Sequence, residues 1–297
     1  MNTIYCPLVC LKFEEDHSRD SKETIINSYM RIIPKEKVPV ENLSRYFFSE
    51  YNINKYKYTD YWLSIDVILE DEDPELKMAC FLVSLFIAIP TKVVIPLLTD
   101  FREYHNLQLY RFQYVPGYTI REVNNTNLGE SIQYYNSIER RILVSKRLNL
   151  SLISTHDACL ARNWALSYIS FVTAFESLLN HNSEWGTKKK VAWAYALLTE
   201  TVEEQRQSAF ENFREIYKIR SEITHGETFK DKFNDGKLNI EEIAKCRDML
   251  RKLWQVILIS EEIIIALSGN DIMRRNYFKK IANNWLPKET KRKVEAR

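Results

Sequence analysis

Cysteine is sparse in this sequence and follows no framework. The 297 residues include five cysteines, an odd number at irregular positions: Cys6, Cys10, Cys80, Cys159 and Cys246. Cys6 and Cys10 lie close together, but no second pair completes a zinc site. The spacing therefore predicts neither a disulfide scaffold nor a metal centre, and it favours a reducing, cytoplasmic environment.

The sequence pattern also lacks a membrane anchor. No basic segment followed by an apolar run stands at the N-terminus. The longest apolar stretch, Met78 to Ile89, is shorter than the ~20 residues that cross a bilayer. We therefore expect a soluble cytoplasmic protein that does not contact a membrane.

A strong net charge is absent as well. The 42 Lys and Arg residues nearly balance the 40 Asp and Glu residues, and the formal net charge is +2. This balance gives no global field that attracts nucleic acid, so any basic binding surface must be local. A length of 297 residues accommodates two modest domains, each with its own core.

The first 125 residues mix strand and helix patterns. Residues 4–13 have a strand-like composition, and Pro7 favours an edge position. Residues 61–70 alternate between apolar and polar side chains, which predicts a half-buried strand. Helical periodicity is possible around residues 21–33 and 41–50.

Two further signals complete this part. Residues 78–89 are continuously apolar and suit either a buried helix or a buried strand, and the turn residues at 115–118 predict a hairpin. We expect an α+β N-terminal domain over residues 1–125 that senses a signal or positions a substrate.

Helical periodicity dominates from residue 128 onward. A connecting helix is predicted over residues 126–153, and a bundle of four to five helices over residues 154–270. Capping residues and apolar spacing place the bundle helices at 154–180, 187–198, 201–225 and 239–269. The fold class predicted from the sequence is therefore mainly α. A basic tail is expected over residues 271–297.

The most informative stretch is residues 217–227, which read Tyr-Lys-Ile-Arg-Ser-Glu-Ile-Thr-His-Gly-Glu. Arg220 carries a permanent charge on a planar group that matches a phosphate, and His225 carries an imidazole, the kind of side chain that commonly gives or takes a proton in catalysis. On a helical wheel Arg220 lies within about 40° of an apolar stripe, whereas His225 lies about 140° further round. Gly226 follows as a C-cap signal, so we expect His225 on the last turn of its helix.

This stretch, together with the upstream segment Phe171 to Leu179, resembles the HEPN superfamily and, within it, the Apea-like group. The similarity covers roughly residues 154–268. It implies a dimeric helical bundle whose Arg-x4-6-His motif is the active site of a metal-independent endoribonuclease. Matched residue by residue, the motif falls on Arg220 and His225. The common upstream glutamate falls on Glu176.

Further residues surround the motif. Glu176 lies on an otherwise apolar face, where it either orients Arg220 for function or forms a structural ion pair. Tyr217 and Ser221 share a line with His225 that suits a polar site wall or a solvated face. Ser221 departs from the Asn, Asp or His that many active members carry after the arginine. Glu222 and Thr224 complete the supporting set.

Local basic segments are the candidate RNA-binding surface. They are Lys188, Lys189 and Lys190 at a predicted helix start, and Arg274, Arg275, Lys279 and Lys280 in the predicted tail. The lysine run suits RNA phosphate or an ordinary solvated face. Aromatic residues within the tail suit base stacking or docking of the tail on the bundle.

The sequence thus leads to a hypothesis and two rivals. The first is a metal-independent endoribonuclease without a cofactor, acting on RNA as a toxin or antiviral defence effector. It would be a homodimer with a composite site, restrained by an antitoxin or regulatory partner. The second is a catalytically silent HEPN bundle for dimerisation, nucleotide binding or partner binding. The third is a plain helical scaffold.

Overall fold

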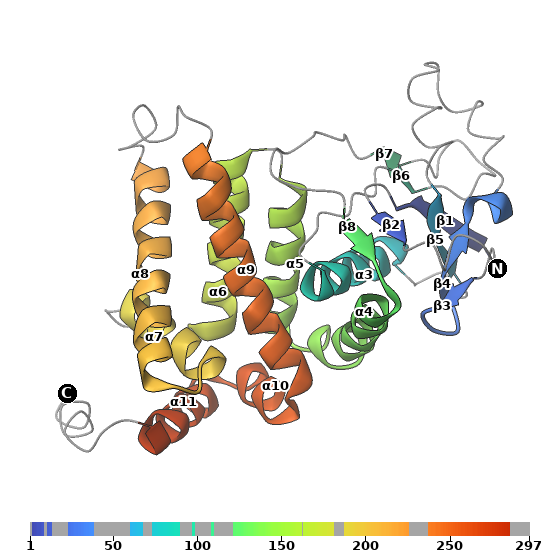
Figure 1. Cartoon of the computed structure of the whole chain (residues 1–297). Helices are drawn as coiled ribbons and strands as arrows, with labels where there is room; N and C mark the ends of the chain where they lie inside the picture. Colours follow the sequence, from blue (N-terminus) through green and yellow to red (C-terminus); the bar gives the residue numbers. More distant parts are fainter. Residues whose placement is uncertain are drawn as a thin grey trace. The chain divides into compact units, whose positions relative to one another are not determined.

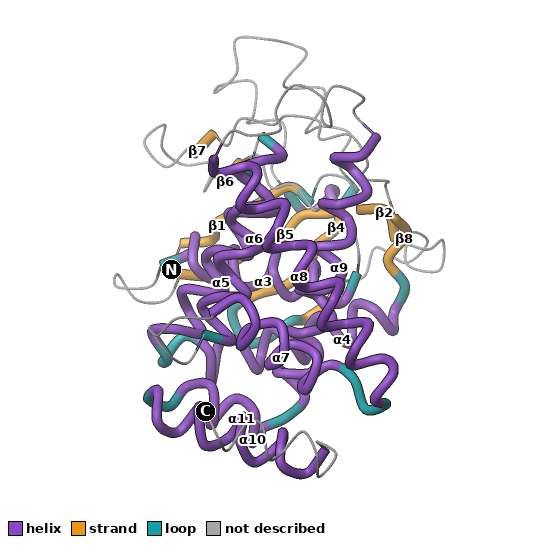
Figure 2. The backbone as a smooth tube through the Cα atoms, turned by 90° about the vertical axis from the view of Figure 1, so that its left-hand side faces the viewer, coloured by secondary structure: helices purple, strands orange, loops and turns teal. Residues whose placement is uncertain are grey.

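A computed structural model describes residues 2–8, 11–13, 23–38, 60–67, 73–89, 97–98, 108–109, 121–161, 163–180, 187–225 and 237–285. The chain divides into two compact units, Met1–Tyr135 and Asn136–Arg297. Within the described residues the structure is mainly helical, and a small antiparallel sheet belongs to the first unit (Figures 1 and 2).

The four-stranded sheet has the order β1 (Asn2–Pro7), β5 (Tyr61–Val67), β4 (Met30–Pro34) and β3 (Thr24–Ile25). All neighbouring pairs are antiparallel. The strand predicted over residues 4–13 is two strands, because β2 (Leu11–Phe13) pairs instead with β8 (Arg121–Val123). Among the described strands β1 lies at the edge of this sheet, as Pro7 predicts.

The predicted helix at residues 21–33 is wrong. The side chain of Asn27 accepts a 3.0 Å hydrogen bond from the Tyr29 N–H, and this local turn reverses the chain between β3 and β4. The central strand β5 is also buried on both faces, not on one. Asp66 lies inside it because Thr3 donates a 2.8 Å hydrogen bond to its carboxylate and Arg31 forms an ion pair with it.

The apolar run at residues 78–89 lies almost entirely in a helix, α3 (Pro74–Ala88). Asp73 caps it by accepting hydrogen bonds from the N–H groups of Glu75 and Leu76, and proline at the first helical position suits this start. In the same unit, Ser84 of α3 meets Ser131 of α4 (Asn125–Ser137) at 3.1 Å between hydroxyl oxygens.

The remaining short elements of the first unit are the 3₁₀ turn η1 (Lys35–Lys37) and the strand pair β6 (Leu97–Leu98) and β7 (Gln108–Leu109). The predicted helix at 41–50 and the predicted turn at 115–118 lie outside the described residues.

The second unit is built from helices. Its elements are the π-helix η4 (Ile138–Ile142), α5 (Lys146–Leu160), α6 (Trp164–Leu179), α7 (Thr187–Thr199), α8 (Glu203–His225), α9 (Lys237–Ile259), α10 (Glu261–Ser268) and α11 (Asp271–Trp285). Figure 1 shows α5 to α9 as a bundle, with α10 and α11 across one end.

Local capping divides helices that were predicted to be continuous. The helix expected over residues 154–180 breaks where Asn163 caps α6, its side chain accepting a 2.7 Å hydrogen bond from Ala165 N–H. The helix expected over residues 239–269 breaks at Ser260, which caps α10. Periodicity missed both breaks because the apolar face continues through them.

A chain of buried polar groups joins three bundle helices. Trp254 of α9 donates a 3.1 Å hydrogen bond to the hydroxyl of Thr155 in α5. Thr155 donates to the Ser151 carbonyl, and Ser151 donates to the Ala174 carbonyl of α6. Every member is buried and hydrogen-bonded, so the core tolerates these polar groups.

Candidate active site

Helix α8 is positioned by the apolar stripe that its sequence predicts. Phe213, Ile216 and Ile223 are buried, and the Phe213 ring packs edge-on against Phe175 of α6 with centroids 4.8 Å apart. Tyr217 continues this contact, since its ring centroid lies 5.6 Å from that of Phe213. The aromatic contacts fix the α6-facing side of the motif helix.

Arg220 meets Glu176 at this helix pair. The Arg220 Nη2 lies 3.6 Å from Oε2 of Glu176, and the two side chains are 32% and 26% exposed. The Nε of Arg220 is buried and has no hydrogen-bond partner among the described residues. The arginine is thus held by a carboxylate on one side and still has a donor that no described group satisfies.

Tyr217 adds a buried hydroxyl beside this pair. The Tyr217 hydroxyl is close to the Glu176 carboxylate, yet no described group meets it with hydrogen-bond geometry. Burial raises the pKa of Tyr217 well above its ordinary value, and the negative charge of Glu176 raises it further. The hydroxyl is therefore a neutral donor at physiological pH.

His225 stands apart from these three residues. It is the last residue of α8 and is exposed, as its divergence from Arg220 around the helix requires. Gly226 and the residues up to 236 lie outside the described part of the chain. A single chain therefore presents the arginine and the histidine in different directions.

The supporting residues are largely engaged within α8 itself. The Thr224 hydroxyl donates to the carbonyls of Arg220 at 2.6 Å and Ser221 at 3.2 Å. Ser221 and Glu222 are half-buried, and Glu222 also has an interaction partner. Tyr217, Ser221 and His225 run from the core to the surface along one line of the helix.

The basic candidates differ in how accessible they are. Lys188 and Lys189 are exposed and Lys190 is half-buried at the start of α7. On α11, Lys279 is exposed and Arg275 is half-buried. Lys280 is exposed and pairs with Glu262 at 3.0 Å.

Arg274 does not belong to this surface. It is 1% exposed, and it donates to the carbonyl of Asn180 at 3.0 Å and to Asp271. The predicted tail begins as helix α11, and Phe278, which is 6% exposed, docks this helix. Residues 286–297 lie outside the described residues.

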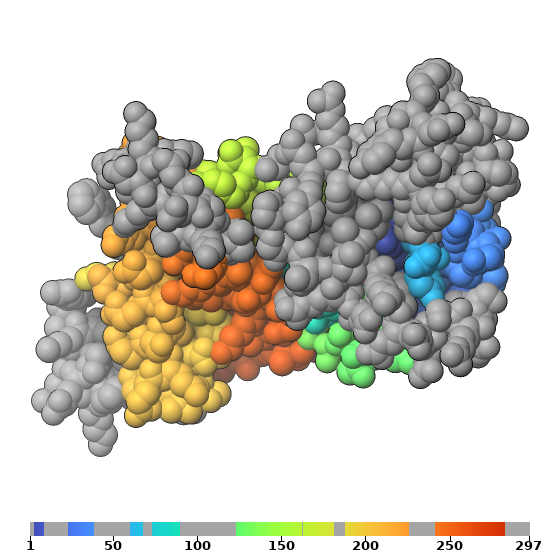
Figure 3. Space-filling model, turned by 45° about the horizontal axis from the view of Figure 1, so that its top comes forward, coloured from blue at the N-terminus to red at the C-terminus, as the bar shows by residue number. Residues whose placement is uncertain are grey.

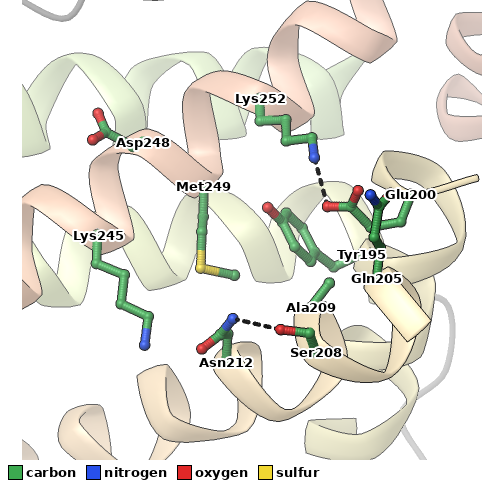
Figure 4. A pocket seen from close by; sticks show the side chains of 10 residues that line it. All are labelled: Tyr195, Glu200, Gln205, Ser208, Ala209, Asn212, Lys245, Asp248, Met249 and Lys252. Carbon is green, nitrogen blue, oxygen red and sulfur yellow. Dashed lines mark hydrogen bonds and ion pairs between the residues drawn. The ribbon is translucent and has the colours of Figure 1, made fainter. Parts of the chain in front are cut away.

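A groove of ≈ 510 Å³ runs between α8 and α9 (Figure 4). Three of its lining residues, Gln205, Ser208 and Asn212, come from α8, and Lys245, Asp248 and Lys252 come from α9. Gln205 lies on the side of Lys252 and Asn212 on the side of Lys245, so the two helices are antiparallel (Figures 1 and 4). Their surfaces lie side by side in Figure 3. The Lys252–Glu200 ion pair, with 2.5 Å between Nζ and Oε1, crosses one end. Both charge signs line the groove, so it has no evident preference for an anion.

No group of three or more His, Cys, Asp or Glu side chains is arranged to hold a metal ion within the described residues. No helix in the described part of the chain is both long and apolar enough to cross a membrane.

Comparison with known proteins gave no relative. No family model matches this chain, and searches of the curated proteins and of the solved structures found no match.

Proposed function

We propose that the protein is a metal-independent endoribonuclease of the HEPN type. The observation that carries the proposal is the partly buried Glu176–Arg220 pair, with an exposed histidine five residues further along the same helix. A held arginine can stabilise the charge on a phosphate and an accessible imidazole can transfer a proton, and both suit metal-free cleavage of RNA.

The reaction follows from these groups. An imidazole nitrogen of His225 takes the proton of a ribose 2′-hydroxyl, and the resulting oxygen attacks the adjacent phosphorus. Arg220 stabilises the negative charge that builds on the phosphate oxygens. The bond to the 5′-oxygen breaks and that oxygen takes up a proton. The products are a 2′,3′-cyclic phosphate and a free 5′-hydroxyl.

Glu176 and Tyr217 have supporting roles in this proposal. Glu176 keeps the guanidinium of Arg220 in one orientation, and the neutral hydroxyl of Tyr217 supplies a further donor at the same place. Exposed lysines at the start of α7 and on α11 would contact RNA phosphates outside the reacting centre.

A homodimer completes the site. Because Arg220 and His225 diverge, a two-fold axis past the end of α8 would bring the histidine of one chain opposite the arginine of the other. One histidine then acts as base and the other as acid. An activity of this kind suits a toxin or antiviral effector in the cytoplasm, restrained by an antitoxin or regulatory partner.

The test compares purified wild type with His225→Ala and Arg220→Ala on a labelled RNA in excess EDTA. Wild type should yield 2′,3′-cyclic phosphate ends, and both variants should lose cleavage while they keep their fold by circular dichroism. Cleavage that disappears in EDTA and returns with Mg²⁺ would contradict the mechanism.

The alternative is a catalytically silent HEPN bundle that dimerises or binds a nucleotide or protein partner. Ser221 at the position after the arginine, and the near-neutral formal net charge of +2, favour it. No cleavage by a dimeric wild type, and equal growth of cells expressing wild type or His225→Ala at equal soluble levels, would support this second function.

A further inference from the structure

A second feature of the C-terminal unit lies where two helices begin. A hollow of ≈ 450 Å³ is lined by Ser145, Lys146 and Arg147 at the start of α5, and by Asn270, Asp271 and Arg274 at the start of α11. Because α8 and α9 are antiparallel and α10 follows α9, the hollow lies at the opposite end of the bundle from His225 (Figure 1).

Positive charge exceeds negative charge in this hollow. Arg147 Nη2 lies 2.9 Å from Oδ1 of Asp271, and Arg274 Nη2 lies 2.5 Å from the same oxygen. Two guanidinium groups thus share one carboxylate. Lys146 adds a third cation to the lining, so the four groups leave an excess of two positive charges.

Arg274 is the buried cation of this hollow, and a nearby anion would stabilise it. Its side chain is 1% exposed, and its Nε has no hydrogen-bond partner among the described residues. Burial lowers the pKa of Arg274, and the nearby charge of Arg147 lowers it further. A buried guanidinium with a like-charged neighbour is costly unless further negative charge lies near it.

The start of α5 supplies further donors. Ser145 is the N-cap residue, but its side chain makes no capping hydrogen bond. The first hydrogen bond of the helix runs from Asn149 N–H to the Ser145 carbonyl, so the N–H groups before it have no partner within the helix. The positive end of the helix dipole therefore faces the hollow without a side-chain acceptor.

A purely structural role accounts for part of this cluster. Arg147 and Arg274 both donate to the Asn180 carbonyl, at 2.7 and 3.0 Å, and so tie the end of α6 to α5 and α11. This role explains neither the uncapped start of α5 nor the presence of Lys146 in the lining.

We propose that this hollow binds the phosphate group of a small phosphomonoester, such as a nucleoside monophosphate. A dianionic phosphate matches the charge excess, and its oxygens accept from guanidinium and backbone N–H groups together. A volume of ≈ 450 Å³ is in the range of small-ligand pockets. The site goes beyond the proposed nuclease function and does not depend on it.

Isothermal titration calorimetry of the full chain tests the proposal, with inorganic phosphate, adenosine 5′-monophosphate and adenosine as probes at constant ionic strength. Wild type should bind phosphate and the monophosphate at one site per chain, and should not bind adenosine. Lys146→Glu should weaken the binding of phosphate and of the monophosphate by tenfold or more, and a tenfold loss corresponds to about 1.4 kcal/mol of binding free energy. Its fold should be kept, since an acidic residue suits the first turn of a helix.

The matched control is Lys218→Glu, the same charge change on the exposed middle of α8. It should change affinity less than twofold. A second variant, Ser145→Asp, places a capping carboxylate at the start of α5 and should also abolish phosphate binding without lowering the thermal midpoint.

Three results would overturn the proposal. The first is the absence of saturable binding by wild type up to about 10 mM phosphate or monophosphate. The second is an equal loss in Lys146→Glu and Lys218→Glu, which would mean a general charge effect. The third is binding of an RNA oligonucleotide alone at this hollow, which would assign it to a polymer backbone.

Discussion

Trp254 and Thr155 are joined by a 3.1 Å hydrogen bond from the indole N–H to the threonine hydroxyl, within the core of the helical unit. The pair connects α9 to α5, and the two residues are almost 100 positions apart in the sequence. The same hydroxyl donates a hydrogen bond to the Ser151 carbonyl. Both side chains are buried, so neither has water as an alternative partner.

Thr155→Val should therefore destabilise the protein although it preserves shape. The variant leaves the buried indole N–H without an acceptor, which costs about 1–3 kcal/mol. Urea unfolding followed by tryptophan fluorescence measures the loss. The control is Ser177→Ala, which removes a half-buried hydroxyl that bonds only within its own helix and should cost less than about 0.5 kcal/mol. Equal losses in the two variants would contradict the prediction.

The Glu176–Arg220 pair should matter more for activity than for stability. Both side chains are about a quarter to a third exposed, so Glu176→Gln should cost no more than about 1 kcal/mol of unfolding free energy. In the proposed nuclease it frees the guanidinium to reorient, and cleavage should fall about 10²-fold. Parallel denaturation and cleavage assays decide this. A stability loss of several kcal/mol with unchanged cleavage would assign the pair a structural role only.

Two glycines should respond in opposite directions to alanine. A Cβ at Gly269 would lie 2.9 Å from both Cβ and Sδ of Met273, so Gly269→Ala forces the α10–α11 turn apart and should cost about 1–3 kcal/mol. A Cβ at Gly129, inside α4, meets nothing within 4 Å. Gly129→Ala should stabilise by about 0.4–1 kcal/mol. Thermal midpoints of the two variants give the comparison, and a shift of the same sign in both would refute it.

Alkaline pH should destabilise the fold through its buried thiols. Burial raises the pKa of Cys80 from 9.0 to about 12, and the charge of Asp73 adds to the effect. The same cause raises the pKa values of Cys6 and Cys246. Each thiol has a higher pKa in the folded state than in the unfolded state. Their contribution to the free energy of unfolding is therefore complete below pH 9. It decreases as the pH rises, because the unfolded chain then loses protons that the folded chain keeps.

The slope is about 1.4 kcal/mol per pH unit for each such thiol between its two pKa values. Urea unfolding of wild type and Cys80→Ala at a series of pH values from 8 to about 10.5 measures it. The variant should show the shallower decline. Parallel curves would mean that Cys80 ionises equally in both states.

Several parts of the fold were predictable because a local pattern decides them. Alternation predicted β5, and the stripe of Phe213, Ile216 and Ile223 predicted α8. Arg220 beside this stripe is half-buried. The breaks at Asn163 and Ser260 were missed, because a single capping side chain outweighs the apolar periodicity that continues past it.

The burial of Arg274 and the role of Arg147 had no local signal. Both depend on the Asn180 carbonyl, which a distant part of the chain supplies, and Arg147 depends also on Asp271 of α11. The sequence of a basic segment does not indicate whether its arginine faces solvent or packs against the end of another helix. Only the packing of α11 distinguishes the two.

The parallel pairing of β2 with β8 has a consequence for how the chain folds. The two strands are more than 100 residues apart in the sequence, so the contact closes a long loop and forms late. During synthesis β2 cannot pair until residue 123 has left the ribosome. We therefore expect the first unit to depend on its own last segment, and a nascent chain stopped before β8 to expose an unpaired strand that invites aggregation.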